Sequence, residues 1–147
     1  MRPGVYSRPM DPAEVKGMQA LLRQRGIQPT PQRLLIAGLL FARDQHLTAE
    51  QIILALAEAG TQVSKATVYN TLNLFSAKGL LKPLQVDPER GLFDSNTTAH
   101  HHIHVEDTGE LVDVPFDAVE FARLPLLPPG TEAVGVDVVI RVRRRDG

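Results

Sequence analysis

The stretch that decides the fold is "SKATVYNTLNLFSAKG", Ser64 to Gly79. It opens on a serine, a favoured helix N-cap, and closes on a glycine, which can end a helix in the left-handed conformation. Between these two residues Val68, Leu72 and Phe75 recur at helical spacing and should face a core. The opposite side is short, polar and nearly free of acidic residues. The stretch therefore predicts a helix with one buried face and one polar face.

The polar face of this helix suits the major groove of DNA. The small side chain of Ala66 lets the helix lie deep in the groove, where Tyr69 and Asn70 can reach base edges. Hydroxyls, an ammonium group and free backbone N–H groups in the first turn suit phosphate. A solvated helix face has the same composition, so the neighbouring elements must decide. The predicted DNA-binding residues are Ser64, Lys65, Ala66, Thr67, Tyr69, Asn70 and Asn73.

Three further helices precede this one, each with its own N-terminal residue pattern. Each begins with Asp or Thr as N-cap, and the first two continue with proline at the first helical position. Glycine can end the first and the third. In chain order, these start and stop residues are Asp11, Gly26, Thr30, Thr48 and Gly60.

A hairpin follows the helices. The segments "LLKPLQVD" and "RGLFDSN" flank a Pro-Glu-Arg-Gly turn at residues 88–91. Short helices with short connections, followed by a hairpin, are typical of a winged helix-turn-helix. We therefore expect a winged-helix DNA-binding domain over residues 1–83, with the hairpin wing and a hinge extending to about residue 93.

The charge distribution favours the same division. The chain has 147 residues, 43% of them hydrophobic, which allows one domain or two small ones. Residues 1–82 carry ten Lys and Arg against five Asp and Glu, whereas residues 83–147 carry six against twelve. A basic half joined to an acidic half suggests a nucleic-acid module fused to another unit. Chance variation over short segments is the alternative explanation.

Several classes of protein are excluded by composition. The chain has no cysteine, which rules out disulfides, thiolate zinc sites and thiol catalysis, so any metal must use nitrogen and oxygen ligands. No apolar run is long enough to span a bilayer. The first ten residues lack the apolar core of a signal peptide. We therefore expect a cytoplasmic protein without a membrane partner.

The second half should be a small α/β unit, which makes the whole chain α+β. "HHIHVE" and "ELVDVP" flank a turn at Asp107–Gly109 and should form a hairpin. "FDAVEFARL", residues 116–124, reads as a short helix, and the alternating apolar residues from Val134 to Val142 read as a strand. So few strands cannot cover their own apolar face. We therefore expect residues 94–147 to be a dimerisation domain that pairs with a second copy.

Four of the five histidines lie within residues 100–104. Because side chains alternate along a strand, His100, His102 and His104 should point one way and His101 the other. Asp113 lies across the predicted hairpin and can approach His102. Histidines on a surface strand are usually unliganded, so the cluster alone leaves both readings open.

A family resemblance adds to these patterns. "PTPQRLLIAGLLF", "HLTAEQII", "VSKATVYNTLNLFSAKGLL" and "FDSNTTAHHHIHVEDTGELVDVP" resemble the Fur superfamily of metal-responsive repressors over roughly residues 15–115. The resemblance implies a DNA-binding dimer with a regulatory metal site that joins the two domains, and it makes residues 94–147 the metal- or haem-sensing domain. Two or three imidazoles with two carboxylates suit Fe²⁺, Mn²⁺ or Zn²⁺. The matching ligand positions are His46, Asp94, His100, His102 and Asp113.

The chain also departs from the common pattern of that family. The two CxxC pairs that hold a structural zinc are absent, and Val105 and Thr108 stand where the first pair would be. Of a second regulatory site only Glu120 and His101 remain. The resemblance therefore implies no cysteine-based structural zinc.

These departures are most similar to the iron response regulator branch, which implies a haem-responsive regulator of iron and haem homeostasis. The haem ligand candidates are His100, His101 and His102, since the N-terminal Cys-Pro motif of that branch is missing. Direct sensing of Fe²⁺, Mn²⁺ or Zn²⁺, or peroxide sensing at the same ligands, is the alternative. An enzyme is disfavoured, because no nucleophile–base pair or phosphate-binding glycine loop is visible.

Overall fold

The computed structural model describes residues 10–87 and 90–145. The chain divides into two compact units, residues 1–97 and 98–147. Asp94 therefore lies in the first unit and not at the start of the second, where the sequence predicted it. Pro88 and Glu89 of the expected turn, and most of the segment tested for a signal peptide, lie outside the described residues.

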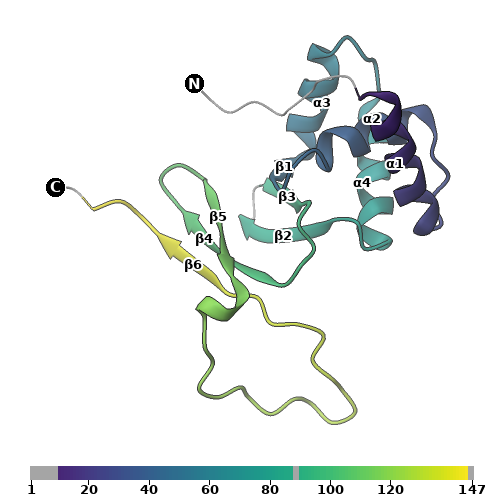
Figure 1. Ribbon diagram of the computed structural model, residues 1–147. Helices are drawn as coiled ribbons and strands as arrows, with labels where there is room; N and C mark the ends of the chain where they lie inside the picture. Colours follow the sequence, from purple (N-terminus) through teal and green to yellow (C-terminus); the bar gives the residue numbers. More distant parts are fainter. Residues whose placement is uncertain (1–9, 88–89, 146–147) are drawn as a thin grey trace. The chain divides into compact units, whose positions relative to one another are not determined.

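The described residues of the first unit contain four helices (Figure 1). The side chain of each predicted N-cap accepts a backbone N–H from the first turn of its helix, which confirms the expected helix starts. Glycines with positive φ, at 71° to 78°, follow the first, third and fourth helices. The helices are α1 (Pro12–Gln24), α2 (Pro31–Leu40), α3 (Ala49–Glu58) and α4 (Lys65–Ala77).

A three-stranded antiparallel sheet completes the first unit. It contains β1 (His46–Thr48), β2 (Lys82–Asp87) and β3 (Arg90–Asp94), in the order β1-β3-β2. Strands β2 and β3 form the predicted hairpin. Strand β1 was not predicted, because three residues are too few to show a period of two. Its pairing places His46 directly opposite Asp94.

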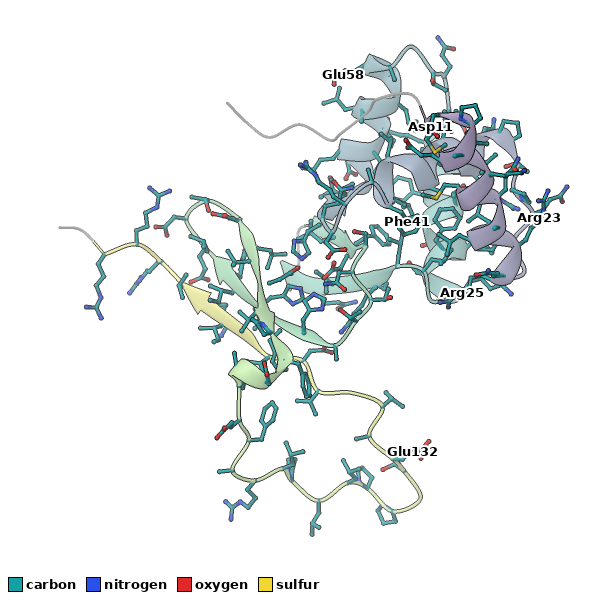
Figure 2. All side chains as sticks on the ribbon, viewed as in Figure 1. Asp11, Arg23, Arg25, Phe41, Glu58 and Glu132 are labelled. Carbon is teal, nitrogen blue, oxygen red and sulfur yellow. The ribbon has the colours of Figure 1, made fainter. Side chains whose placement is uncertain are left out.

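The core of the first unit lies between the helices. Val68, Leu72 and Phe75 of α4 are fully buried, as their spacing predicts. Phe41, labelled in Figure 2, follows α2 and brings its ring to 6.0 Å from the ring of Phe75. Leu22, from α1, is also fully buried. Because this core draws on all the helices, it fixes the orientation of α4 and leaves its polar face outward.

The second unit contains a three-stranded mixed sheet. Its strands are β4 (His100–Val105), β5 (Leu111–Pro115) and β6 (Val139–Val142), in the order β5-β4-β6. Strands β4 and β5 form the predicted antiparallel hairpin, and Gly109 has a φ of 75° in its turn. Strand β6 pairs with β4 in parallel.

Two predictions for the second unit are wrong. The helix predicted over residues 116–124 is only a 3-10 turn, η1 (Phe116–Ala118), followed by irregular chain. A short helix needs an apolar surface to pack on, and Phe121 and Leu124 are 40% and 54% exposed. The strand predicted from Val134 begins only at Val139, where β4 provides a pairing partner. Figure 1 shows the chain between η1 and β6 as an open loop.

Within the described parts of the chain, none of the helices is both long and apolar enough to cross a membrane.

Candidate functional site

The polar face of α4 is the first candidate site. Ala66, Tyr69, Asn70 and Asn73 are all exposed along it, as the helical spacing predicts. Ser64 and Lys65 are exposed at the helix start, and Thr67 is half-buried. All seven predicted DNA-binding residues therefore lie on or beside one outward surface.

The start of α4 is held by two hydroxyls. Ser64 Oγ accepts the backbone N–H of Thr67 at 3.1 Å, and the two hydroxyl oxygens lie 2.8 Å apart. Such a cap fixes the first turn in a helical conformation. The free N–H groups of that turn, with the Lys65 ammonium beside them, form an electropositive helix end that suits phosphate.

A polar cleft adjoins this face within the first unit. It has a volume of about 250 Å³. The Arg33 side chain beside it donates to the carbonyl oxygen of Gln28 at 2.9 Å. A cleft lined by hydroxyls, amides and a guanidinium favours a polar, anionic ligand over an apolar one. Its lining residues are Thr30, Gln32, Arg33, Thr67, Asn70 and Thr71.

Glu50 is a residue of this face that the sequence analysis missed. The Tyr69 hydroxyl donates to Glu50 Oε1 at 2.6 Å, from α4 to the first turn of α3. This hydrogen bond is the main reason that the pKa of Glu50 is lowered, with a backbone hydrogen bond and the Lys65 charge adding to it. The same bond raises the pKa of Tyr69. In sequence Glu50 reads only as a favourable first-turn acid, since its partner lies nineteen residues away.

The first unit also contains two of the predicted metal ligands. His46 Nε2 lies 3.3 Å from Asp94 Oδ2, and the Asp94 side chain is fully buried. Asp94 Oδ1 accepts the backbone N–H of Asn96 at 2.9 Å. A buried carboxylate needs such partners, because an isolated charge in the interior is costly. The fold therefore holds His46 and Asp94 together, and both side chains carry atoms that can bind a metal.

Hydrogen bonds between Gln45 and Ser95 keep strands β1 and β3 in register. The backbone N–H of Gln45 donates to Ser95 Oγ at 3.0 Å, and the backbone N–H of Ser95 donates to the Gln45 carbonyl at 3.1 Å. The Gln45 side-chain amide donates to the carbonyls of Leu39 and Leu40 at the end of α2. The residues next to His46 and Asp94 thus fix both side chains to the helical core.

The second unit contains the other three predicted ligands. Asp113 Oδ1 lies 3.4 Å from His100 Nε2 and 3.5 Å from His102 Nε2. The strand pairing sets His102 opposite Asp113, as predicted, and the two imidazole rings are 4.5 Å apart. The ligand atoms of these three residues lie within 4.8 Å of one another. One carboxylate and two imidazoles on one face suit a divalent first-row ion.

The tautomer of His100 is fixed by the backbone. Its Nδ1 lies 2.5 Å from the carbonyl oxygen of Thr98, which can only accept, so Nδ1 carries the proton. The lone pair is then on Nε2, the atom that faces Asp113. A backbone partner of this kind orients the ring of a metal-ligating histidine.

His101 lies in a different environment. It is fully buried, its Nδ1 accepts the backbone N–H of Val138 at 3.0 Å, and its ring stacks on Phe116 at 5.1 Å. Among residues 10–87 and 90–145, no group of three or more ligand-type side chains includes His101 or Glu120. The expected second metal site therefore has only these two residues to support it. The haem candidates are likewise split, with His100 and His102 directed at Asp113 and His101 at Phe116.

Comparisons with known proteins identify the family of this chain. Residues 24–126 match the family model described as "Ferric uptake regulator family". The chain is 39% identical over 112 residues to the peroxide-responsive repressor PerR of Staphylococcus aureus (strain Mu50 / ATCC 700699), which covers 76% of each protein. The corresponding repressor of strain USA300 is 38% identical over the same length and coverage.

Solved structures show the same relationship. The structure of the ferric uptake regulator from Pseudomonas aeruginosa with manganese is similar with a TM-score of 0.67 and 28% identity, over 88% of this chain and 98% of that one. The Vibrio cholerae ferric uptake regulator shares the fold, with a TM-score of 0.64 and 19% identity over 86% and 98%. The chain therefore belongs to the ferric uptake regulator family, and it is a metal-responsive, DNA-binding transcription regulator and not an enzyme.

Proposed function

We propose that this protein is a dimeric repressor that senses a divalent metal ion directly and reads its operator with α4. The observation that carries the proposal is the presence, in each unit, of a histidine–aspartate group of metal-ligand type whose nitrogen and oxygen atoms lie 3.3 to 3.5 Å apart. The first group is His46 with Asp94, and the second is His100 and His102 with Asp113.

The first unit is proposed to be a winged helix-turn-helix over residues 1–83, with the β2–β3 hairpin as its wing. Three features of α4 support this assignment: an exposed face of short polar side chains, a capped electropositive start and an adjoining polar cleft. In such a domain the recognition helix enters the major groove, where Tyr69 and Asn70 would meet base edges. Ser64, Lys65 and Thr67 would meet the phosphate backbone.

The metal site is proposed to use all five residues, His46, Asp94, His100, His102 and Asp113, on one ion. The donor set fits Fe²⁺, Mn²⁺ or Zn²⁺, which accept imidazole and carboxylate together. A bound ion would supply the positive charge that imidazole and carboxylate ligands share. The chain's own contribution is to hold the ligands in position: the Thr98 carbonyl orients the His100 ring, and the β1–β3 register sets His46 opposite Asp94.

The second unit is proposed to be the dimerisation domain, assigned in the sequence to residues 94–147. Val112 and Ile140 of its sheet, and Phe116 of η1, are between 41% and 49% exposed. Exposed apolar surface of this kind marks an interaction site. A second copy of the same sheet would cover it and would place two recognition helices on one operator.

Haem or iron-status sensing is the second candidate function. The observation that favours it is the run of His100, His101 and His102 in a chain without cysteine. Imidazole can serve as a haem axial ligand. Direct metal sensing accounts for more of the geometry, because it also uses His46, Asp94 and Asp113, which have no role in a haem site built on that run.

The test is a parallel titration of metal-free protein with Mn²⁺, Fe²⁺ and haemin, read by operator binding and by the Soret band. We expect Mn²⁺ or Fe²⁺ to change operator affinity, and Asp113→Ala to abolish that change. Haemin that produces a Soret band and changes operator affinity equally in Asp113→Ala would favour the haem function instead. Oxidation of a ligand histidine by peroxide only in the Fe²⁺ form, seen by mass spectrometry, would indicate peroxide sensing.

A further inference from the structure

We propose that Glu50 determines which base Tyr69 reads, because the carboxylate accepts the hydrogen bond of the phenolic O–H and leaves the Tyr69 oxygen only as a hydrogen-bond acceptor. Tyr69 would then select an amino-bearing base, adenine or cytosine, at one operator position. This inference rests on the proposed DNA-binding role of α4 and adds a base preference to it.

The geometry is that of a strong, directed hydrogen bond. The separation of 2.6 Å between the Tyr69 oxygen and Glu50 Oε1 lies in the range for a hydroxyl donating to an ionised carboxylate. The two side chains come from different helices, α4 and α3. Tyr69 is 41% exposed despite this contact. The hydroxyl is therefore held in place by the first unit while the residue remains open to a ligand.

The direction of this hydrogen bond follows from the charges around it. An ionised carboxylate has no proton to give, so the phenol must be the donor. The bond itself lowers the pKa of Glu50 and raises that of Tyr69. Lys65, one turn before Tyr69 on α4, adds a positive charge that also favours the Glu50 carboxylate. At neutral pH the shared proton is therefore on Tyr69 and points at Glu50.

The consequence for base reading follows from hydroxyl chemistry. A tyrosine hydroxyl has one donor, and Glu50 occupies it, so only acceptor lone pairs remain for DNA. In the major groove adenine N6 and cytosine N4 are donors, whereas guanine and thymine present O6, N7 or O4 as acceptors. An acceptor facing an acceptor gains no hydrogen bond and leaves both unpaired. Tyr69 should therefore favour adenine or cytosine over guanine and thymine.

A purely structural role for Glu50 makes a different prediction. An acid in the first turn of α3 interacts favourably with the helix dipole, and its loss would lower stability. Loss of the same negative charge would also strengthen binding to every DNA sequence, because phosphate repulsion falls. Neither effect depends on the identity of a base. The ratio of affinities between bases is therefore the decisive readout.

The test begins with the full chain and a pool of randomised duplex DNA, selected with metal-free and with Mn²⁺-loaded protein. Relative affinities for the four bases are then measured at each position that the selection enriches. In the unmodified protein we expect one position with a preference for adenine or cytosine of about threefold to tenfold, the contribution of one hydrogen bond. Glu50→Gln should largely remove that preference, because an amide can donate to the phenol and release its proton. Glu58→Gln, at the other end of α3, is the matched control and should keep it.

A double-mutant cycle shows whether Glu50 acts through the hydroxyl. Tyr69→Phe should lose the same preference, and Glu50→Gln in the Tyr69→Phe background should change the base ratio no further. Thermal melting checks each variant, and Glu50→Ala replaces Glu50→Gln if the amide variant unfolds. An unchanged base ratio in the Glu50 variant, or an equal change in both backgrounds, overturns the inference.

If the proposed DNA-binding role of α4 were wrong, the same experiments would give a different set of results. If no sequence is enriched, or if Asn70→Ala and Tyr69→Ala leave affinity for the enriched sequence unchanged, α4 is not the recognition helix and both proposals fall. If Asn70→Ala weakens binding while Glu50→Gln leaves the base ratio intact, the recognition helix stands and only the role of Glu50 is wrong.

Discussion

The two units differ in how far they bury their apolar residues. The first unit closes a core around fully buried residues such as Leu72 and Phe75 and presents a polar face along α4. The second unit buries four histidines of β4 and leaves Phe116 and Leu126 exposed, at 49% and 99%. The first unit covers its own core, whereas we propose that a second copy covers the apolar surface of the second unit.

The largest expected effect is the loss of stability caused by a substitution in the buried core of the first unit. Phe75→Ala should destabilise the first unit by about 3–5 kcal/mol, because it removes a fully buried ring and leaves a cavity. Leu126→Ala, at a site that is 99% exposed, should stay within about 0.5 kcal/mol in dilute protein. Denaturant unfolding of both variants checks this contrast, and equal losses of stability would break it.

A charged substitution on the exposed apolar surface of the second unit should weaken the dimer. Ile140→Asp, on β6 at 44% exposure, should weaken the dimer by about 2 kcal/mol or more, because it places a charge in an apolar interface. Sedimentation equilibrium measures the effect across a concentration series. Glu132→Ala, on the long loop in Figure 2, is the control and should not alter the dimer. A dimer insensitive to Ile140→Asp would mean that another surface carries the contact.

Loss of a side chain from the polar face of α4 should weaken sequence-specific DNA binding. Tyr69→Ala should weaken operator binding by about 1–3 kcal/mol, as expected for a lost base contact, while the fold and dimer remain intact. A gel-shift titration with the selected operator and with unrelated duplex measures both terms. Unchanged operator affinity would remove α4 from the recognition role.

The smallest effect should come from the start of the same helix. Lys65→Ala should reduce binding to all sequences and lower the slope of log affinity against log salt by about 0.9, the value for one phosphate contact. Binding at several salt concentrations gives the slope directly. A slope equal to that of the unmodified protein would show that Lys65 does not touch the backbone.

The sequence predicted features whose partners are local. The helix starts were predictable because Asp11, Thr30 and Ser64 cap the turn that immediately follows them. The His102–Asp113 pair was predictable because hairpin symmetry around one turn sets which residues face each other. Both are short-range consequences of backbone geometry.

Features with distant partners could not be predicted in the same way. Strand β1 exists because Leu47 pairs with Phe93, and Glu50 belongs to the α4 face because α3 packs against α4. The helix expected at residues 116–124 has helical spacing but no surface to pack on within the described chain. Periodicity reports the tendency of a segment, and tertiary contacts decide whether that tendency is realised.

The central claim is that the ligands of the two units act on one ion, and His46→Ala tests it most directly. Four proposed ligands would remain, so the variant should keep much of its Mn²⁺ affinity but lose most of the effect of Mn²⁺ on operator binding, typically about 1–3 kcal/mol. His100→Ala should lose both, and Glu106→Gln, an exposed acid after β4, should lose neither. The measurement is a double titration of each variant with Mn²⁺ and operator. A His46→Ala protein that retains the full Mn²⁺-dependent change in operator affinity would contradict the claim.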